Sequence, residues 1–402
     1  MDCRLSGDPA SKGLIPVLAL VGSFGPLAMD MYLSALPALR HDLHTDAAGA
    51  GSTLSVFLLG MAIGQLLYGP LSDRFGRKTM LLTGATLYMV ASLLCLLSHD
   101  LISFNALRLV QAMGAASGLT LSRAMVRDLF DERHLADLFS ILSVVSLAAP
   151  LIAPIFGTGI ILIGGWRLIF AVLAALGLVC LTAIALVLPE SLPPERRTGR
   201  LRLGATLAGF GGLVIHPRFL TAALATGCVS GILFANVTGS ALLLMERFGF
   251  GRMGFTIIFT LAMIGMMGGG QANRRLLLRY SGRVIMRTAG TIAILAGLAM
   301  IAATAINPYL LCTVLVVMTT CVGFMLPNGA ASAMMATDRI GIASSLLGVI
   351  QFGSGSLSSA LVTFAGARTA EGMALVMCGF AIAARGLWAM RERLDDRQAM
   401  AV

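Results

Sequence analysis

Asp30 and Arg108 are charged residues that stand well inside apolar stretches of this sequence. Asp30 interrupts a run that is otherwise largely apolar from Gly13 to Leu36. A carboxylate in the middle of a membrane span costs about 2.5–3.5 kcal/mol on insertion scales, and such residues often mark proton relays. Asp30 is the only acid within the apolar runs of the chain. We therefore take its carboxyl group as the first candidate for proton uptake and release.

Arg108 lies in the stretch ALRLVQAMGAASG, residues 106–118. At 1.5 Å per residue it lies ~6 Å from Phe104, while Asp30 lies ~10 Å from Pro37, so the two charges have similar depth in the outer half of the bilayer. Intramembrane charges usually face the bundle interior and find partners. We predict that Asp30 and Arg108 face the bundle interior as functional residues. Arg108 could instead snorkel to the outer interface, and Asp30 could be only its structural partner.

The stretch GPLSDRFGRK, residues 69–78, is the most specific motif. Gly69 and Gly76 permit close backbone approach and a sharp turn. A basic loop that only sets topology would need neither the spaced glycines nor an aspartate. The pattern predicts a conformational latch, whose charged members are Asp73, Arg74, Arg77 and Lys78.

The stretch LAAPLIAPIFG, residues 147–157, places Pro150 and Pro154 one turn apart, with Gly157 at its end. Each proline removes a backbone hydrogen bond and tends to bend a helix. One interpretation is a bend that shapes a cavity, and the other is a passive kink, because prolines are common in membrane helices.

Other polar or aromatic residues within apolar runs are candidates for lining a substrate cavity, although each alone is more typical of helix packing. They are Tyr32, Gln65, Gln111, Phe234, Asn236, Phe324 and Gln351. The sequence holds no phosphate-binding loop, no nucleophile–base pairing and no metal-ligand spacing. We therefore expect neither an enzyme nor a cofactor or metal, and a proton as the coupling ion.

The elements that position these residues follow from composition. Hydrophobic residues make up 57% of the chain and charged residues only 12%, with a mean hydropathy of +0.89. Soluble domains carry about 25% charged residues, so the class is a multi-span membrane protein. The net charge of +10 does not indicate nucleic-acid binding, because the positive residues lie in short loops, as topology signals do.

The sequence predicts twelve membrane-spanning helices, because each apolar run is close to the ~20 residues that a crossing needs and a lone span must be helical. The runs are 13–36, 52–71, 79–97, 104–125, 138–162, 168–188, 219–244, 253–272, 286–306, 309–335, 341–364 and 372–390. The first run exceeds the roughly 7–15 residues of a signal-peptide core, so we expect a retained helix.

Orientation follows from the basic residues. With the N-terminus in the cytoplasm, 23 of the 29 Lys and Arg residues fall on the cytoplasmic side and 5 on the other, Arg108 being the remaining one. This asymmetry predicts that both termini are cytoplasmic.

The chain also divides into two similar halves. We predict a six-helix bundle over 1–188, a cytoplasmic central loop over 189–218 and a second six-helix bundle over 219–402. Residues 64–80 and 270–286 match at a constant offset and occupy equivalent junctions. The identical pairs are Gly64/Gly270, Gln65/Gln271, Leu71/Leu277, Gly76/Gly282, Arg77/Arg283 and Met80/Met286. Chance could give a few such matches, but the equivalent position favours duplication and hence pseudo-symmetry.

Several stretches together resemble one family. They are MDMYLSALP (29–37), GQLLYGPLSDRFGRK (64–78), RLVQAMGAASG (108–118), MVRDLF (125–130), APLIAPIFG (149–157), GGWRLIF (164–170), PESLPPERR (189–197) and GIASSLLG (341–348). In order and spacing they are similar to the Bcr/CflA drug:proton antiporters of the major facilitator superfamily, which are related to bicyclomycin-resistance and chloramphenicol or florfenicol exporters. The matches in the second half are thinner than those in the first.

The resemblance implies a major facilitator fold, a bacterial inner-membrane location, a monomer, and export of small drug-like molecules against proton entry. By motif position it carries the intramembrane acid of helix 1 onto Asp30 and the arginine of helix 4 onto Arg108, and implies that these two residues couple transport to protons. Some phenicol exporters have a second acid two turns earlier, where this chain has Gly22. That departure weakens the expectation of a phenicol substrate and leaves Asp30 alone for proton exchange.

For the latch, the resemblance implies that Asp73 engages the cytoplasmic start of helix 11, here near Gly341, and an arginine at the end of helix 4, here Arg123 or Arg127. A carboxylate is stabilised at a helix N-terminus and by a guanidinium. Arg279 stands in the position of Asp73 in the second half, so we expect one complete latch, which holds the cytoplasmic side closed.

We therefore predict proton-coupled drug efflux by alternating access, with the lipid bilayer, a proton and a small drug-like molecule as partners. The leading alternative is a major facilitator exporter of a native metabolite, such as an amino acid or a peptide. A channel or an intramembrane enzyme is disfavoured, because a channel should lack the duplicated junction and an enzyme should show an acid/base or metal constellation.

Overall fold

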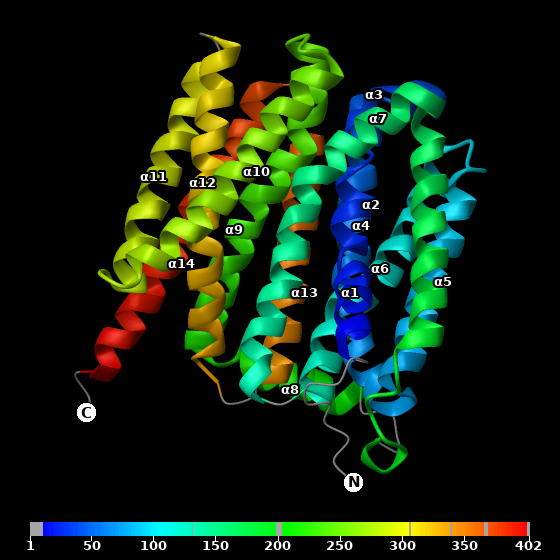
Figure 1. The fold of residues 1–402 in the computed structure, drawn as a ribbon. Coiled ribbons are helices and arrows are strands. Elements are labelled where there is room, and N and C mark those ends of the chain that lie inside the picture. Colours follow the sequence, from blue (N-terminus) through cyan, green and yellow to red (C-terminus); the bar gives the residue numbers. More distant parts are fainter. Residues whose placement is uncertain are drawn as a thin grey trace. The chain divides into compact units, whose positions relative to one another are not determined.

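A computed structural model of the chain describes residues 11–130, 132–197, 203–304, 307–337, 340–365 and 369–399 (Figure 1). Secondary structure within these residues is entirely helical, which confirms the predicted all-α class. The helices are α1 Ser11–Gly22, α2 Phe24–Asp30, α3 Leu36–Asp42, α4 Ala47–Phe75, α5 Arg77–Cys95, α6 Leu101–Leu129, α7 Glu132–Val187, α8 Leu203–Val214, α9 Pro217–Leu242, α10 Gly251–Leu276, α11 Gly282–Ala303, α12 Pro308–Met334, α13 Ile340–Phe364 and α14 Ala370–Ala399. Short 3-10 turns cover Leu33–Ala35 and Pro194–Arg196, and a π-helical turn covers Leu243–Arg247. Residues 198–202 of the predicted central loop and both chain ends lie outside the described residues.

Nine helices in the described part of the chain are long and apolar enough to cross a membrane, or ten if one bent pair counts as a single span. The sequence predicts twelve, and two features account for the difference from ten. Helix α7 counts once, yet its backbone is non-helical at Gly164 and at Gly165, which has φ 74°, so two helices meet there. Helix α6 is not among the nine, because Arg108 and Gln111 interrupt its apolar character.

The first predicted helix, 13–36, is broken rather than continuous. Its two parts, Gly13–Gly22 and Phe24–Asp42, meet at 41°. Pro26 has no N–H to donate to the carbonyl of Gly22, so the chain leaves the α-helix at Ser23. The α-helical part that follows ends at Asp30, before the 3-10 turn. The carboxyl group of Asp30 therefore stands at a helix end.

Contacts between Cα atoms divide the chain into two compact units, of which the first comprises Met1–Ala35 and Val56–Thr206. In this unit α1 and α2 pack on α6 and α7, and α5 packs on both α6 and α7. A glycine permits the close packing of α6 on α5. A Cβ atom on Gly114 would lie only 2.6 Å from the backbone nitrogen of Tyr88, so the two backbones can be this close only because residue 114 has no side chain.

Gly157 has the same role beside Asp30. A Cβ atom on Gly157 would overlap the carbonyl group of Met31, so only glycine lets α7 approach the chain where α2 ends. Pro150 and Pro154 lie inside helical backbone, and the non-helical residues of α7 are Gly164 and Gly165. A bend at the two prolines that shapes a cavity stays a prediction.

The second unit comprises Leu36–Ser55 and Leu207–Val402. Helix α9 packs on α12, α13 and α14, α12 packs on α10 and α11, and α11 packs on α14 (Figure 1). Polar contacts hold the segment Leu36–Ser55 in this unit. Arg40 forms an ion pair with Glu246, and the Ser55 hydroxyl donates to the Oγ atom of Ser359 over 2.8 Å.

Candidate functional site

Asp30, the last residue of α2, is buried in the first unit with 2% of its surface exposed. Its Oδ1 atom makes no hydrogen bond to any described residue. Buried polar atoms are nearly always hydrogen-bonded, so an unsatisfied one needs an explanation. A proton on the carboxyl group, or a partner that arrives during a functional cycle, would supply it.

Arg108 lies in α6 and is fully buried. Its Nη1 atom donates to the carbonyl oxygen of Ala28 over 3.0 Å and to Oε1 of Gln111 over 2.6 Å. The guanidinium carbon lies 4.3 Å from the ring centroid of Tyr32 and 4.2 Å from that of Phe57. Desolvated cation–π contacts of this kind contribute about 2 kcal/mol or more. Aromatic faces and neutral oxygens therefore stabilise this buried charge.

Asp30 and Arg108 are coupled indirectly. No ion pair of 4.0 Å or less joins them in the described part of the chain. Arg108 instead binds the carbonyl of Ala28, two residues before Asp30, at the end of α2 where carbonyl groups favour a cation. Its Nε and Nη2 atoms have no hydrogen-bond acceptor among the described residues. The site thus combines free donors on the arginine with a free acceptor on the aspartate.

Gln111 fixes the position of the guanidinium. Its Nε2 atom donates to the Ser92 hydroxyl over 2.7 Å, and that hydroxyl donates to the carbonyl of Tyr88 over 2.6 Å. The Tyr88 ring stacks on Phe24 of α2, with centroids 4.1 Å apart. This chain of contacts connects α6 through α5 back to α2, the helix that Asp30 ends.

The structure brings two of the predicted cavity residues, Tyr32 and Gln111, into direct contact with Arg108. Gln65 is buried in α4 of the same unit. Phe57, and Phe170 with its ring centroid 5.7 Å from the guanidinium, were not predicted, because single apolar aromatic residues carry no signal of a cation partner.

The other predicted cavity residues lie in the second unit. Phe234 of α9 packs on Phe352 of α13, with ring centroids 5.8 Å apart. Asn236 is buried and donates to the Thr319 hydroxyl over 3.3 Å, which connects α9 to α12. Phe324 packs partly buried in the core of this unit, and Gln351 is half-buried in α13. A substrate cavity lined by these residues stays a prediction.

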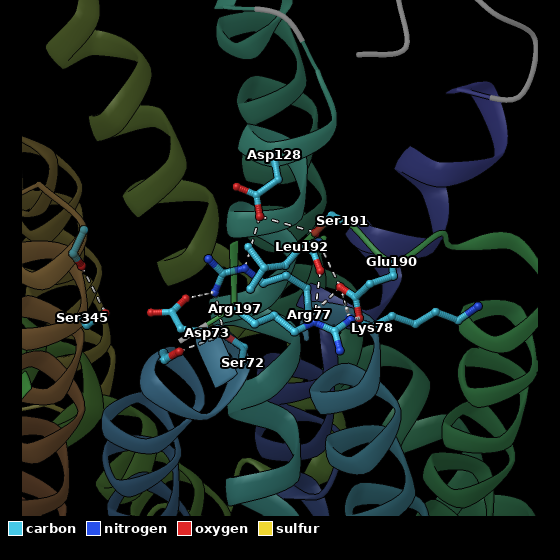
Figure 2. Close-up of polar contacts among 12 residues, drawn as sticks. Ser72, Asp73, Arg77, Lys78, Asp128, Glu190, Ser191, Leu192, Arg197 and Ser345 are labelled. Carbon is cyan, nitrogen blue, oxygen red and sulfur yellow. Dashed lines mark hydrogen bonds and ion pairs between the residues drawn. The ribbon is translucent and has the colours of Figure 1, made fainter. Parts of the chain in front are cut away.

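The 69–78 motif forms a dense polar cluster, drawn in Figure 2. Gly76 has φ 98° and precedes the first residue of α5. The backbone N–H groups of Arg77 and Lys78 donate to Oε1 of Glu190 over 2.8 and 3.4 Å. A carboxylate at a helix N-terminus satisfies free N–H groups and the helix dipole. Glu190 therefore caps α5 from 113 residues away in the sequence.

Arg77 is the centre of the same cluster. It forms ion pairs with Asp73 over 2.9 Å and with Asp128, at the end of α6, over 3.2 Å. We expected Arg123 or Arg127 to be the partner of Asp73. In this structure Asp73 pairs with Arg77, and among the described residues no ion pair joins it to either arginine, so its engagement by Arg123 or Arg127 stays a prediction. The contribution of α6 to this cluster is therefore an acid, Asp128.

Sequence reasoning missed the partners Asp128, Glu190 and Arg197, the last of which pairs with Glu190 over 3.4 Å. All three fall in stretches, 125–130 and 189–197, that carried the family resemblance. The signal that could have found the two acids is their position near helix ends that adjoin an unusually basic junction. Gly69 lies within helical backbone of α4, and Arg74 stacks on Phe75 beside the cluster.

Replacing Glu190 with Ala should destabilise the first unit. The N–H groups of Arg77 and Lys78 would lose their acceptor, and loss of such a cap costs about 0.5–2 kcal/mol. We expect a lower unfolding temperature for the purified protein in detergent. The matched control is Glu195→Ala, which removes an exposed acid from the same loop. Equal unfolding temperatures for the two variants would contradict the capping role.

Apolar helices that enclose a buried, partly unsatisfied acid and arginine define a multi-span membrane protein of the transporter class. Comparison with known families agrees. The sequence model described as Major Facilitator Superfamily matches residues 18–360. The chain belongs to the Major Facilitator Superfamily.

Relatives support the assignment over most of the chain. It is 33% identical over 356 residues to "Uncharacterized MFS-type transporter YdgK" of Bacillus subtilis, covering 86% of this chain and 87% of that protein. It is 30% identical to "Bicyclomycin resistance protein homolog" of Haemophilus influenzae, covering 90% and 92%. It is also 30% identical to "Multidrug resistance protein MdtL" of Escherichia coli, covering 86% and 87%. The resemblance seen in the motifs is thus confirmed.

Solved structures agree on the fold. A bacterial homolog of the human lysosomal transporter Spinster, in an inward-facing and unoccupied conformation, matches with a TM-score of 0.75 at 17% identity, covering 96% of this chain and 98% of that one. The xylose transporter XylE from Escherichia coli matches with a TM-score of 0.74 at 14% identity, covering 95% and 98%. At these identities the likeness concerns the fold alone.

Proposed function

We propose that this transporter exports small drug-like molecules across the bacterial inner membrane in exchange for protons. The observation that carries the proposal is Asp30, the only acid in the apolar runs, which is buried with a free carboxyl oxygen. The names of relatives, multidrug resistance protein and bicyclomycin resistance protein homolog, support the substrate class.

The proposal includes twelve spans and a monomer. The apolar helices number ten in the described part of the chain when the bent pair is counted as one span, and they become twelve when α6 is added and α7 is divided at Gly164 and Gly165. This count gives two six-helix halves, 1–188 and 219–402, on either side of a cytoplasmic loop over 189–218, with both termini in the cytoplasm. Arg108 lowers the hydropathy of α6 yet is stabilised by buried partners, so its presence is compatible with a span.

Proton exchange rests on the environment of Asp30. Charging a carboxyl group that stays buried is costly, whereas water or a nearby cation favours the charged form. In our proposal Asp30 takes up a proton when the site opens outward and releases it when the site opens inward and the substrate binds. Arg108 contributes by its hydrogen bond to the carbonyl oxygen of Ala28, which holds the end of α2, and with it Asp30, in place against α6. The proton moves inward and the substrate outward in one cycle.

The cytoplasmic latch is part of this proposal. Asp73 would leave its intra-unit partner Arg77, or share it, when the carboxylate engages the segment near Gly341, and Arg127 would contribute to the same closed state.

We expect Asp73→Asn to slow transport several-fold in everted vesicles, because an amide has no charge to offer a helix N-terminus. Glu195→Gln is the matched control. Unchanged transport by Asp73→Asn would contradict the proposal that Asp73 holds the cytoplasmic side closed.

Transport measured in everted inner-membrane vesicles tests the function. Antibiotics, amino acids and peptides are offered as separate substrates, with and without an ionophore that dissipates the pH gradient. The proposal expects uptake of drug-like compounds that stops when the gradient is dissipated. Growth of a pump-deficient host on the same drugs provides a second readout. If the gradient drove uptake of amino acids or peptides but not of drug-like compounds, the proposal of drug export would be wrong and metabolite export would take its place.

A further inference from the structure

Two helices of the second unit, α11 and α14, pack side by side (Figure 1) and leave an open groove with a volume of about 330 Å³. Its lining combines two guanidinium groups, two hydroxyl groups and one aliphatic side chain. The lining residues are Arg287, Thr288, Thr291, Ile292 and Arg385. None of them has a role in the transport mechanism proposed above.

A glycine determines where Arg385 lies. A Cβ atom on Gly290 of α11 would lie 3.1 Å from Cδ and 3.7 Å from Cβ of Arg385. The aliphatic part of this arginine therefore rests on α11 at a position that has no side chain. The consequence is that two like charges, those of Arg287 and Arg385, line one groove, which is unfavourable without an anion nearby.

The acids beyond the groove are already engaged. Arg283 pairs with Asp396 over 2.7 Å and with Asp395 over 3.8 Å. Asp395 also pairs with Arg218, over 3.0 Å, and with Arg391. The carboxylates of Asp395 and Asp396 thus form ion pairs with arginines outside the groove lining, and Asp395 is shared between three of them. They leave no spare negative charge for the groove.

Within the groove, acidic groups neutralise the charges of Arg287 and Arg385 only weakly. Glu392, which follows the groove on α14, accepts a hydrogen bond from the Trp388 indole over 3.1 Å. It lies 4.0 Å from Nε of Arg287, at the outer limit for an ion pair. Arg385 makes no ion pair with any described residue. The groove therefore holds more positive charge than its own chain neutralises.

Apolar side chains continue from the groove along both helices. On α11 Ile292, Leu295 and Leu298 are 42%, 60% and 52% exposed, and on α14 Ile382 is 53% exposed. In a membrane protein such a face lies against acyl chains. The arginines precede these residues on α11 and follow them on α14, so both charges lie at the same end of the apolar face. By the distribution of basic residues, that end is cytoplasmic.

We propose that this groove binds an anionic phospholipid of the cytoplasmic leaflet. A phosphate diester accepts paired hydrogen bonds from guanidinium groups, and the Thr288 hydroxyl can add a donor. The acyl chains then cover the apolar face beside Ile292. Basic grooves between helices at the cytoplasmic side suit such headgroups, and each arginine near an anionic surface adds roughly fivefold to binding.

Lipid titration followed by native mass spectrometry tests the proposal on the purified, delipidated full-length protein. We expect phosphatidylglycerol to bind more tightly than phosphatidylcholine. In the double variant Arg287→Gln/Arg385→Gln, phosphatidylglycerol binding should weaken roughly 25-fold, at fivefold for each arginine. Arg283→Gln is the matched control, because it removes a neighbouring charge outside the groove lining and should leave binding within about twofold.

Two outcomes would overturn the proposal. One is equal affinity of the parent protein for the two lipids, a comparison that does not depend on how any variant folds. The other is binding of inorganic phosphate or glycerol phosphate as tight as that of phosphatidylglycerol, which would make the groove a site for a soluble anion. Because the readout is lipid binding, the result is independent of whether the protein exports drugs.

Discussion

Replacing Asp30 with Asn will abolish proton coupling. The purified parent protein should release protons when a transported drug is added, and the variant should release none. In everted vesicles the variant should lose drug accumulation against a gradient, down to the level of vesicles without the protein. The reason is that an amide cannot take up or release a proton, and no other acid lies in the apolar runs of the chain.

The matched control is Asp46→Asn. Asp46 is an exposed acid whose Oδ1 atom accepts the N–H of Gly49 over 2.7 Å, at the start of α4. Asparagine caps helices as well as aspartate does, so this variant should fold and transport normally. If the Asp30 variant retained drug-induced proton release while the control behaved like the parent, the proton would have to use another group.

Replacing Arg108 with Lys should reduce transport about tenfold or more although the charge is retained. The Nη1 atom of Arg108 donates to both Ala28 and Gln111. A lysine side chain ends short of this position, so it cannot reach both acceptors in the present geometry, and its compact ammonium lacks the planar face that lies over the rings of Tyr32 and Phe57. Losing one hydrogen bond of a buried charge costs about 1.5–3 kcal/mol, and 1.4 kcal/mol corresponds to a factor of about ten. Initial rates of proton-driven uptake in everted vesicles measure the effect.

The variant Arg108→Ala distinguishes positioning from folding. It removes the cation and leaves Gln111 without its partner, so we expect it to lower the free energy of unfolding by about 3 kcal/mol. The control for both variants is Arg167→Lys, since Arg167 also lies over an aromatic ring, that of Trp166 at 4.3 Å, but in a half-buried position. Full transport by Arg108→Lys would mean that only the charge matters and that the link to α2 does not.

Much of the protein could be predicted because the bilayer imposes simple rules. Apolar run length predicted the helical membrane class, and the motifs predicted the family. The cost of an intramembrane charge singled out Asp30 and Arg108, and both prove to be buried. Gly76 was predictable as a turn residue, and its φ of 98° bears that out. In each case the property belongs to one residue and its neighbours in the chain.

Only the tertiary structure decided which groups meet. It placed Arg108 over rings from Tyr32 and Phe57 instead of in an ion pair with Asp30, and it brought Glu190 to the start of α5. Such contacts join segments far apart in the chain, and their geometry depends on which helix faces pack together. Depth in the membrane follows from position along a helix, but the direction of a side chain around the helix axis follows from packing. The sequence by itself therefore singled out one acid and one arginine within apolar runs, and packing determined that they are buried and linked through the end of α2.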